Sequence, residues 1–127
     1  MNKYQIEQIE LGIKNGVDVT IYAKKWFRLD QMRLIRHGLE KGLDVSSYAK
    51  KEFSLDQMWE IREGLEAGVD VTAYAKPEFS CYQMCQIRYG LMERLDVSSY
   101  SKPGISWQKM MIIRESLMTE KKWISIR

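Results

Sequence analysis

Apolar and polar residues follow one another along the chain with the period of an α-helix rather than with the alternation of a strand. The clearest stretch carries four residues at i, i+3, i+4 and i+7, which are Met58, Ile61, Arg62 and Leu65. Ser54 and Gln57 precede it with the spacing of a capping box, and Gly68 follows it where a helix commonly ends. The pattern predicts an amphipathic helix of about 13 residues.

This pattern repeats along the chain with a period of 26 residues. Four tyrosines mark the period most plainly, and they are Tyr22, Tyr48, Tyr74 and Tyr100. Their surroundings read VDVTIYAKKWF, LDVSSYAKKEF, VDVTAYAKPEF and LDVSSYSKPGI. The helical stretch recurs as LDQMRLIRHGLEKG, LDQMWEIREGLEAG and CYQMCQIRYGLMER, with a weaker copy near each end of the chain. An internal repeat of this kind indicates an array of supersecondary units.

The tyrosine segment of each repeat predicts a second, short helix of about six residues. An aspartate suits the N-cap of each short helix, and these aspartates are Asp18, Asp44, Asp70 and Asp96. Since neither helix can bury its apolar face alone, we expect an all-α fold, an α-solenoid of about four to five two-helix repeats in one domain, 1–127. The expected units are 2–27, 28–53, 54–79 and 80–105, with a capping unit at 106–127.

The repeat resembles a short tandem helical repeat found in proteins of phages and mobile elements of gut bacteria. The resemblance rests on the string DQMxxIRxGLExGLDVSxYAKxEF, which spans 30–53 and, with small changes, 56–79. It covers most of the chain, and the last copy departs from it at Ser116 and Trp123. It implies helical repeats and a mobile-element setting without a catalytic signature. It also suggests a protein that binds and modulates or inhibits a host protein, such as one of host defence.

Composition and charge narrow the functional classes. The chain has no apolar run approaching the ~18 residues of a membrane span and no signal-peptide pattern, so we expect an intracellular protein. Together with the mobile-element setting that the resemblance implies, this suggests the cytoplasm of a bacterial host cell. The net charge of +3 is too small to demand a polyanionic partner. It divides into basic, acidic and basic blocks, because 14–51 carry 9 basic and 4 acidic residues, whereas 52–79 carry 2 basic and 7 acidic ones.

Residues suited to catalysis or metal binding are few. His37 is the only histidine, and its repeat equivalents are of unrelated types, which indicates a solvated helix face rather than an imidazole site. Cys81 and Cys85 stand at i and i+4 on one helix face, and in an intracellular protein we expect them to be free thiols rather than a disulfide framework. Zinc would need about four soft or imidazole ligands, and the chain offers three at most. The sequence therefore predicts no enzyme, no metal, no cofactor and no small-molecule substrate.

Two further ladders of residues repeat with the units. One ladder of arginines falls inside the apolar stripe and consists of Arg36, Arg62, Arg88 and Arg114. These side chains either bind anions or, as we favour, pair with groups of a neighbouring unit. The N-cap aspartates are candidate partners for that pairing. The glycines Gly12, Gly38, Gly64 and Gly90 lie within the long helices, where each costs ~1 kcal/mol relative to alanine. We expect them to allow close approach of adjacent helices.

Aligning the copies gives columns of equivalent positions, and a column whose residues differ between copies is free to contact a partner. The candidate partner-binding residues occupy two such columns and are Arg33, His37, Trp59, Glu63, Tyr89 and Met111. The apolar segment 123–126 either folds back over the open end of the solenoid or forms a dimer or partner surface, so that the protein is a monomer or a dimer through its C-terminal unit. We therefore expect a binding module for a protein partner.

The alternative is a nucleic-acid-binding protein that uses the basic segment 14–51 and the C-terminal tail. Its candidate polyanion-binding residues are Lys24, Lys25, Arg36, Lys50, Lys51, Lys121 and Lys122. The acidic block between these two regions would repel a strand that crosses all units.

Overall fold

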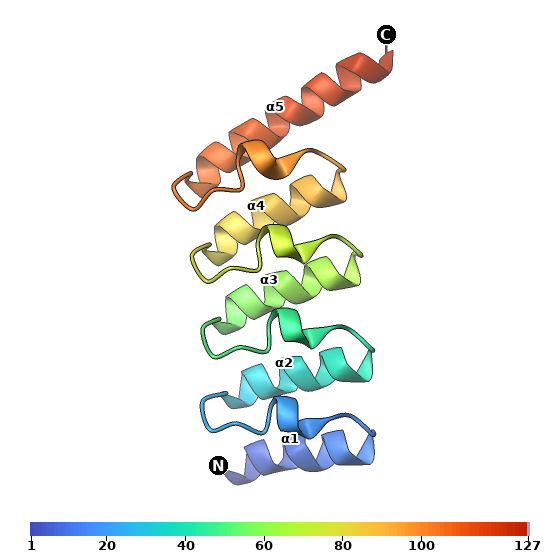
Figure 1. Ribbon diagram of the computed structural model, residues 1–127, viewed down its shortest axis with the longest axis vertical. Coiled ribbons are helices and arrows are strands. Elements are labelled where there is room, and N and C mark those ends of the chain that lie inside the picture. Colours follow the sequence, from blue (N-terminus) through green and yellow to red (C-terminus); the bar gives the residue numbers. More distant parts are fainter. Residues whose placement is uncertain (127) are drawn as a thin grey trace.

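The computed structural model describes residues 1–126, and all regular structure in that range is helical. Five long helices stack one above another along the molecule (Figure 1). They are α1 (Lys3–Lys14), α2 (Leu29–Glu40), α3 (Leu55–Glu66), α4 (Cys81–Met92) and α5 (Trp107–Ile126). Four short 3-10 helices connect them: η1 (Val19–Ile21), η2 (Val45–Ser47), η3 (Val71–Ala73) and η4 (Val97–Ser99). Consecutive long helices pack together, which confirms the predicted all-α repeat fold. Arg127, the last residue of the expected capping unit, lies outside the described residues.

The ends of the long helices follow the signals read from the sequence. At α3, the Ser54 hydroxyl accepts a hydrogen bond from the Gln57 N–H, and the Gln57 side chain accepts one from the Ser54 N–H. Three helices are followed by a glycine in the left-handed region, with φ of 75°, 75° and 74° at Gly16, Gly42 and Gly68. Arg94 takes the corresponding place after α4 with φ of 59°.

The short helices have three residues each, so the predicted length of about six was wrong. Their aspartate caps are present as predicted; the Asp44 carboxylate, for example, accepts a hydrogen bond from the Ser46 N–H at 3.2 Å. The helix ends at Tyr48 because the Lys50 N–H donates to the Tyr48 carbonyl at 2.7 Å. This bond closes a three-residue turn, which interrupts the helical hydrogen-bond pattern. The same turn follows the other three tyrosines of the ladder.

Each of these tyrosines lies against the long helix of its own unit. Tyr48 is fully buried, and its hydroxyl donates to the Leu34 carbonyl at 3.3 Å. A Cβ added at Gly38 would lie 2.0 Å from the Tyr48 oxygen and 2.8 Å from Val45 Cγ1. The other helical glycines repeat this geometry. The close approach expected at these glycines is therefore made by side chains of the adjacent short helix and not by a second backbone, because each glycine makes room for a valine and a tyrosine of its own unit.

A glutamine in the first turn of a long helix ties that helix to the following unit. The Gln31 Nε2 donates to the Phe53 carbonyl at 3.2 Å, and Gln5, Gln57 and Gln83 make the same bond 22 residues ahead. Each of these side chains also accepts, through Oε1, the N–H of the residue that caps its own helix. One amide group therefore caps a helix and fixes the loop that leads into the next one.

The end of the chain does not fold back over the stack. α5 continues as a single helix of 20 residues, and its last turns project past α4 (Figure 1). Ile124 and Ile126 are 63% and 78% exposed. The interpretation in which 123–126 close the open end was therefore wrong, because these residues extend the hydrogen bonding of α5 instead of reversing the chain. Within residues 1–126, no helix is both long enough and apolar enough to cross a membrane.

Candidate functional site

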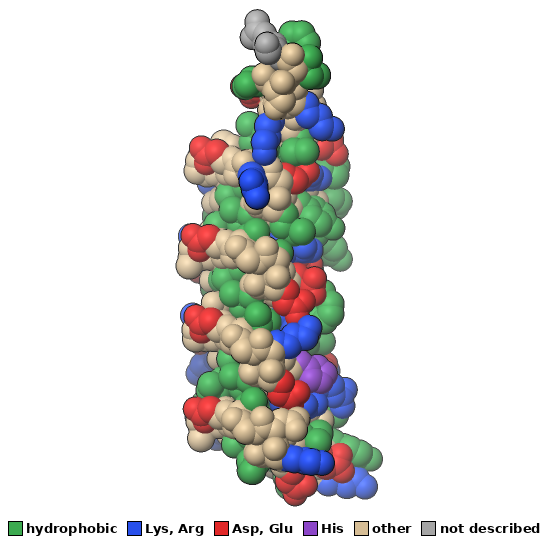
Figure 2. Space-filling view, turned by 90° about the vertical axis from the view of Figure 1, so that its right-hand side faces the viewer, with side chains coloured by type: hydrophobic (Ala, Val, Ile, Leu, Met, Phe, Trp, Pro, Cys, Tyr) green, Lys and Arg blue, Asp and Glu red, His purple; other side chains and the backbone are tan. Residues whose placement is uncertain are grey.

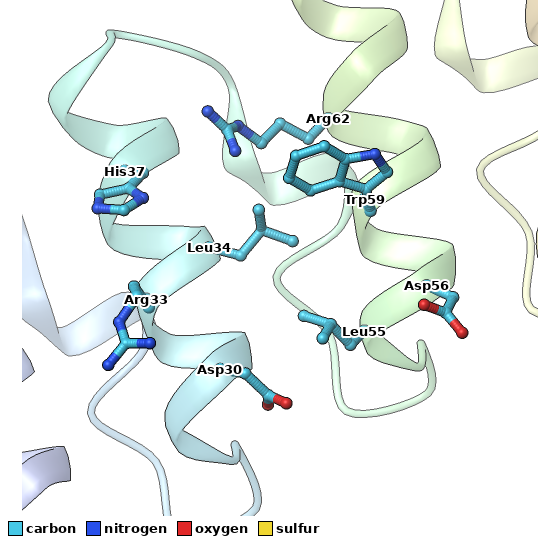
Figure 3. A pocket seen from close by; sticks show the side chains of 8 residues that line it. All are labelled: Asp30, Arg33, Leu34, His37, Leu55, Asp56, Trp59 and Arg62. Atoms are coloured by element: carbon cyan, nitrogen blue, oxygen red, sulfur yellow. The ribbon is translucent and has the colours of Figure 1, made fainter.

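A groove opens between α2 and α3, with a cavity volume of about 280 Å³. Its apolar lining comes from both helices and consists of Leu34, Leu55 and Trp59 (Figure 3). Its ionisable lining is spread along the groove: Asp30 and Asp56 lie near the start of each helix, Arg33 lies one turn along α2 from Asp30, and His37 and Arg62 lie toward the other end. The groove therefore offers an apolar surface with two carboxylates at one end and the Arg62 guanidinium at the other.

Three of the six candidate partner-binding residues line this groove. Arg33 and His37 stand one helical turn apart on α2, and Trp59 lies opposite them on α3 (Figure 3). Arg33 is exposed, His37 is half-buried, and the Trp59 side chain is 48% exposed. Stacking of successive units brings these predicted residues into one site.

The other three candidate partner-binding residues lie outside the groove. Glu63 is half-buried on α3, and Met111 is half-buried on α5. Tyr89 is 40% exposed on α4, and its ring lies 4.9 Å from the Arg88 guanidinium and 5.4 Å from that of Arg114. Tyr89 therefore belongs to the α4–α5 interface, where two cations hold its ring.

The arginine ladder is built into the contacts between units. The Arg36 Nε donates to the Gln8 side-chain oxygen at 2.8 Å, and its Nη1 pairs with Glu40 at 2.5 Å. Equivalent Nε bonds, also 28 residues back, join Arg88 to Glu60 at 2.9 Å and Arg114 to Gln86 at 3.1 Å. The suggested pairing with the N-cap aspartates was wrong, because each aspartate accepts bonds from the Thr or Ser two residues ahead.

Arg62 departs from this pattern. Its Nη2 donates to Glu66 at 3.0 Å, and its guanidinium lies 5.5 Å from the centre of the Trp59 ring. Its Nε is buried and has no hydrogen-bond partner within residues 1–126. The position 28 residues earlier is occupied by Leu34, which offers no acceptor. Buried donors are paired in the great majority of cases, so this one marks the groove as unusual.

His37 lies in a positively charged environment. Its Nε2 is 3.2 Å from the Arg36 Nη2, and since a guanidinium only donates, the histidine nitrogen accepts. Burial, followed by the charges of Arg36, Arg62 and Arg33, lowers the pKa of His37 below its ordinary value of 6.5. The lowered pKa favours the neutral imidazole at pH 7, and the contact with Arg36 favours the tautomer that carries its proton on Nδ1.

The lysines of the nucleic-acid interpretation form two groups. In the first, the Lys24 and Lys51 ammonium groups lie 5.9 Å and 5.8 Å from the centre of the Trp26 ring, and Lys25 and Lys50 are exposed nearby in sequence. Trp26 itself is 49% exposed. This loop cluster combines cations with an accessible aromatic face.

The second group does not continue a basic track from the first. Lys121 donates to the Glu93 carbonyl at 2.7 Å, and Lys122 is exposed on the same helix, α5. Arg36 is only 8% exposed, and its donors are held by Gln8 and Glu40, so it does not face solvent as a polyanion contact would. Figure 2 shows acidic side chains recurring from unit to unit along one edge of the face that it presents, with apolar side chains between the units and basic side chains in separate groups.

Cys81 and Cys85 are free and half-buried on α4, and burial raises the pKa of the Cys81 thiol. Among the residues that the structure describes, no three His, Cys, Asp or Glu side chains gather where they could hold a metal ion. Comparison of the chain with protein-family models, with curated proteins and with solved structures gave no match in any of the three.

Proposed function

We propose that the protein is a non-enzymatic helical-repeat module that binds a protein partner through the face containing the α2–α3 groove. The observation that carries this proposal is the groove itself, which forms where the repeats differ from one another. Arg33, His37 and Trp59 occupy columns that hold other residue types in the other units, yet they meet around one apolar surface. A half-exposed tryptophan beside arginines is typical of interface anchors.

The charges around the groove favour a protein over a nucleic acid. Asp30 and Asp56 lie at one end, where they would repel a chain of phosphates. The ionisable groups that line the groove are aspartates, arginines and a neutral histidine, without an activated nucleophile beside them, which favours binding over catalysis.

The repeat string supports a biological setting for this binding. Its resemblance to repeats of phage and mobile-element proteins leads us to place the protein in the cytoplasm of a bacterial host. There it would modulate or inhibit a host protein, one of host defence being the leading candidate. The apolar end of α5 offers a surface for dimerisation, and sedimentation at increasing concentration tests that part of the proposal.

Trp59 and Trp26 provide a matched pair of variants for testing the function. Both side chains are about half exposed, at 48% and 49%, but only Trp59 lines the groove. Affinity capture from a nuclease-treated bacterial lysate, with identification by mass spectrometry, is carried out with the wild type, Trp59→Ala and Trp26→Ala. We expect a protein that is retained by Trp26→Ala, lost by Trp59→Ala, and little affected by salt.

Nucleic-acid binding stays the second candidate because Lys24 and Lys51 flank the exposed Trp26. It predicts the reverse result in the same experiment. Binding would be lost in Trp26→Ala, kept in Trp59→Ala, removed by nuclease and weakened steeply by salt. Capture that is indifferent to Trp59 would refute the proposed partner face.

A further inference from the structure

The four interfaces between long helices can be compared position by position. At three of them, the arginine Nε is satisfied by a side-chain oxygen 28 residues earlier, from Gln8, Glu60 or Gln86. At the α2–α3 interface that position holds Leu34, and the arginine Nε has no partner. One oxygen atom is therefore missing from an otherwise repeated arrangement, and it is missing at the groove.

Arg62 is held in place although one of its donors is unpaired. Its side chain is 9% exposed, Glu66 accepts from Nη2 at 3.0 Å, and Trp59 lies over the guanidinium. Figure 3 shows the side chain reaching from α3 toward α2, beside Leu34 and Trp59. A guanidinium fixed in this way is pre-organised to bind an acceptor that enters the groove.

We propose that the α2–α3 groove binds a segment of a protein partner that carries a carboxylate side chain next to an apolar one, and that this carboxylate supplies the acceptor missing at Arg62. The inference rests on the proposed function, whose partner it specifies. The apolar side chain of the segment packs on Leu34, Leu55 and Trp59.

The repeat shows which acceptors fit this place. It is filled by an amide oxygen at two interfaces, from Gln8 and Gln86, and by a carboxylate at the α3–α4 interface, where Glu60 forms an ion pair with Arg88. At the α2–α3 groove the positive charges of Arg33 and Arg62 favour the carboxylate, and bonds to a charged acceptor are about twice as strong as neutral ones. The two aspartates at the other end disfavour a polyphosphate chain.

Trp59 is the side chain that admits the carboxylate. The Arg62 Nε is covered in the free protein, and of the two groove side chains that Figure 3 shows beside Arg62, Leu34 is 6% exposed whereas Trp59 is 48% exposed. A rotation of the indole opens the guanidinium while Leu34 stays packed in the core. Binding should therefore change the fluorescence of Trp59, which Trp59→Phe would remove.

The decisive variant is Leu34→Gln, because it introduces the oxygen that Gln8 and Gln86 supply at their interfaces. The probe is a displayed library of short random peptides, selected on the full chain and followed by fluorescence anisotropy of a synthetic peptide from the enriched group. We expect enriched peptides to share a Glu or Asp beside a large apolar residue. We expect Leu34→Gln to weaken their binding roughly ten- to hundredfold, since its own amide occupies Arg62.

Gln86→Leu is the matched control. It makes the opposite exchange at the α4–α5 interface, where it removes the partner of Arg114, and it should leave peptide affinity at the α2–α3 groove unchanged. Replacing the acidic residue of the peptide by leucine tests the same bond without altering the protein, and it should cost a similar factor in affinity. This second measurement decides the question even if Leu34→Gln does not fold.

Three results would overturn the inference: no enrichment of acidic residues among the selected peptides, equal affinity of the wild type and Leu34→Gln, or displacement of the peptide by single-stranded oligonucleotide at physiological salt. Its failure can be told apart from failure of the proposed function. If a captured protein partner depends on Trp59 but binds Leu34→Gln as well as the wild type, the partner face stands and only the role of Arg62 is refuted.

Discussion

The contact between Gly64 and Tyr74 gives the sharpest test of how a repeat unit holds together. A Cβ added at Gly64 would lie 1.9 Å from the Tyr74 oxygen, 2.7 Å from Val71 Cγ1 and 3.1 Å from Tyr74 Cζ. Tyr74 is fully buried, and its hydroxyl donates to the Glu60 carbonyl at 2.7 Å. Gly64→Ala must therefore displace the tyrosine, the short helix, or both.

The magnitude follows from three contributions. Overpacking of a filled core costs about 1–3 kcal/mol, and loss of a buried hydrogen bond costs about 1–3 kcal/mol. Alanine returns about 1 kcal/mol through its higher helix propensity. We expect Gly64→Ala to lower the free energy of unfolding by about 3 kcal/mol. Tyr74→Phe alone should cost about 1 kcal/mol, because it loses the hydrogen bond without a clash.

The double variant separates this explanation from a general cost of substitution. Tyr74→Phe removes the closest atom, so Gly64→Ala in that background should cost only about 1 kcal/mol, a coupling of about 2 kcal/mol between the two sites. Urea unfolding followed by circular dichroism measures all four proteins. Gly104→Ala is the matched control, since nothing lies within 4 Å of its added Cβ, and it should be neutral. Additive effects of the two substitutions, or a Gly64→Ala protein as stable as Gly104→Ala, would refute the steric contact between Gly64 and Tyr74 as the cause.

Other expectations concern Arg62 and the pH limits of the fold. Leu34→Gln should raise the free energy of unfolding by about 1 kcal/mol, because pairing a buried donor outweighs the lost apolar contact, and a lower urea midpoint would contradict this. A hydrogen bond from Asn15 lowers the pKa of Glu40, and one from Lys41 lowers that of Glu66, both below 4.5. The contribution of the two carboxylates to stability is present above pH 4.5 and is lost as pH falls through the lowered pKa values. The double variant Glu40→Gln with Glu66→Gln should therefore lose less free energy of unfolding on acidification than the wild type, as measured by urea titration. Burial raises the pKa of Tyr48 and Tyr100 to about 12, so the stability that these tyrosines add is present below pH 10 and is lost as pH rises through 12. The tyrosinate absorbance of these buried residues should appear together with loss of the helical circular dichroism signal.

The period of 26 residues made the long helices and their ends predictable. Caps such as Ser54 and the left-handed glycines act within a few residues, so sequence spacing alone identifies them. The length of the short helices was missed because it depends on where the tyrosine ring is anchored, which is a tertiary contact. The dual role of the first-turn glutamines was missed too. A capping box accepts Glu as readily as Gln, so the use of Gln in the first four of the five copies was the available signal that the amide donor has a second partner.

The candidate site was predictable in part for a similar reason. Columns that vary between copies pointed to Arg33, His37 and Trp59, and the stack brings these three together. Arg62 was assigned to the apolar stripe, and Leu34 was not singled out, because spacing reveals only which positions share a helix face. The signal lay in the column of Leu34, in which Gln8, Glu60 and Gln86 are polar and only Leu34 and Ile112 of the last copy are apolar. Its meaning depended on knowing which residue lies across the interface.

The bonds that build the stack join residues 14, 22 and 28 positions apart, so none reaches beyond the neighbouring unit. Loss or gain of one whole unit would leave the remaining tyrosines and glutamines with partners of the right kind. The arginines would be reassigned, since each one meets whichever unit comes before it. A chain lacking 54–79 would set Arg88 against Leu34, moving the unpaired Nε to a groove that has Cys85 in place of Trp59. Recombination between repeats would in this way rearrange the binding surface while preserving the scaffold.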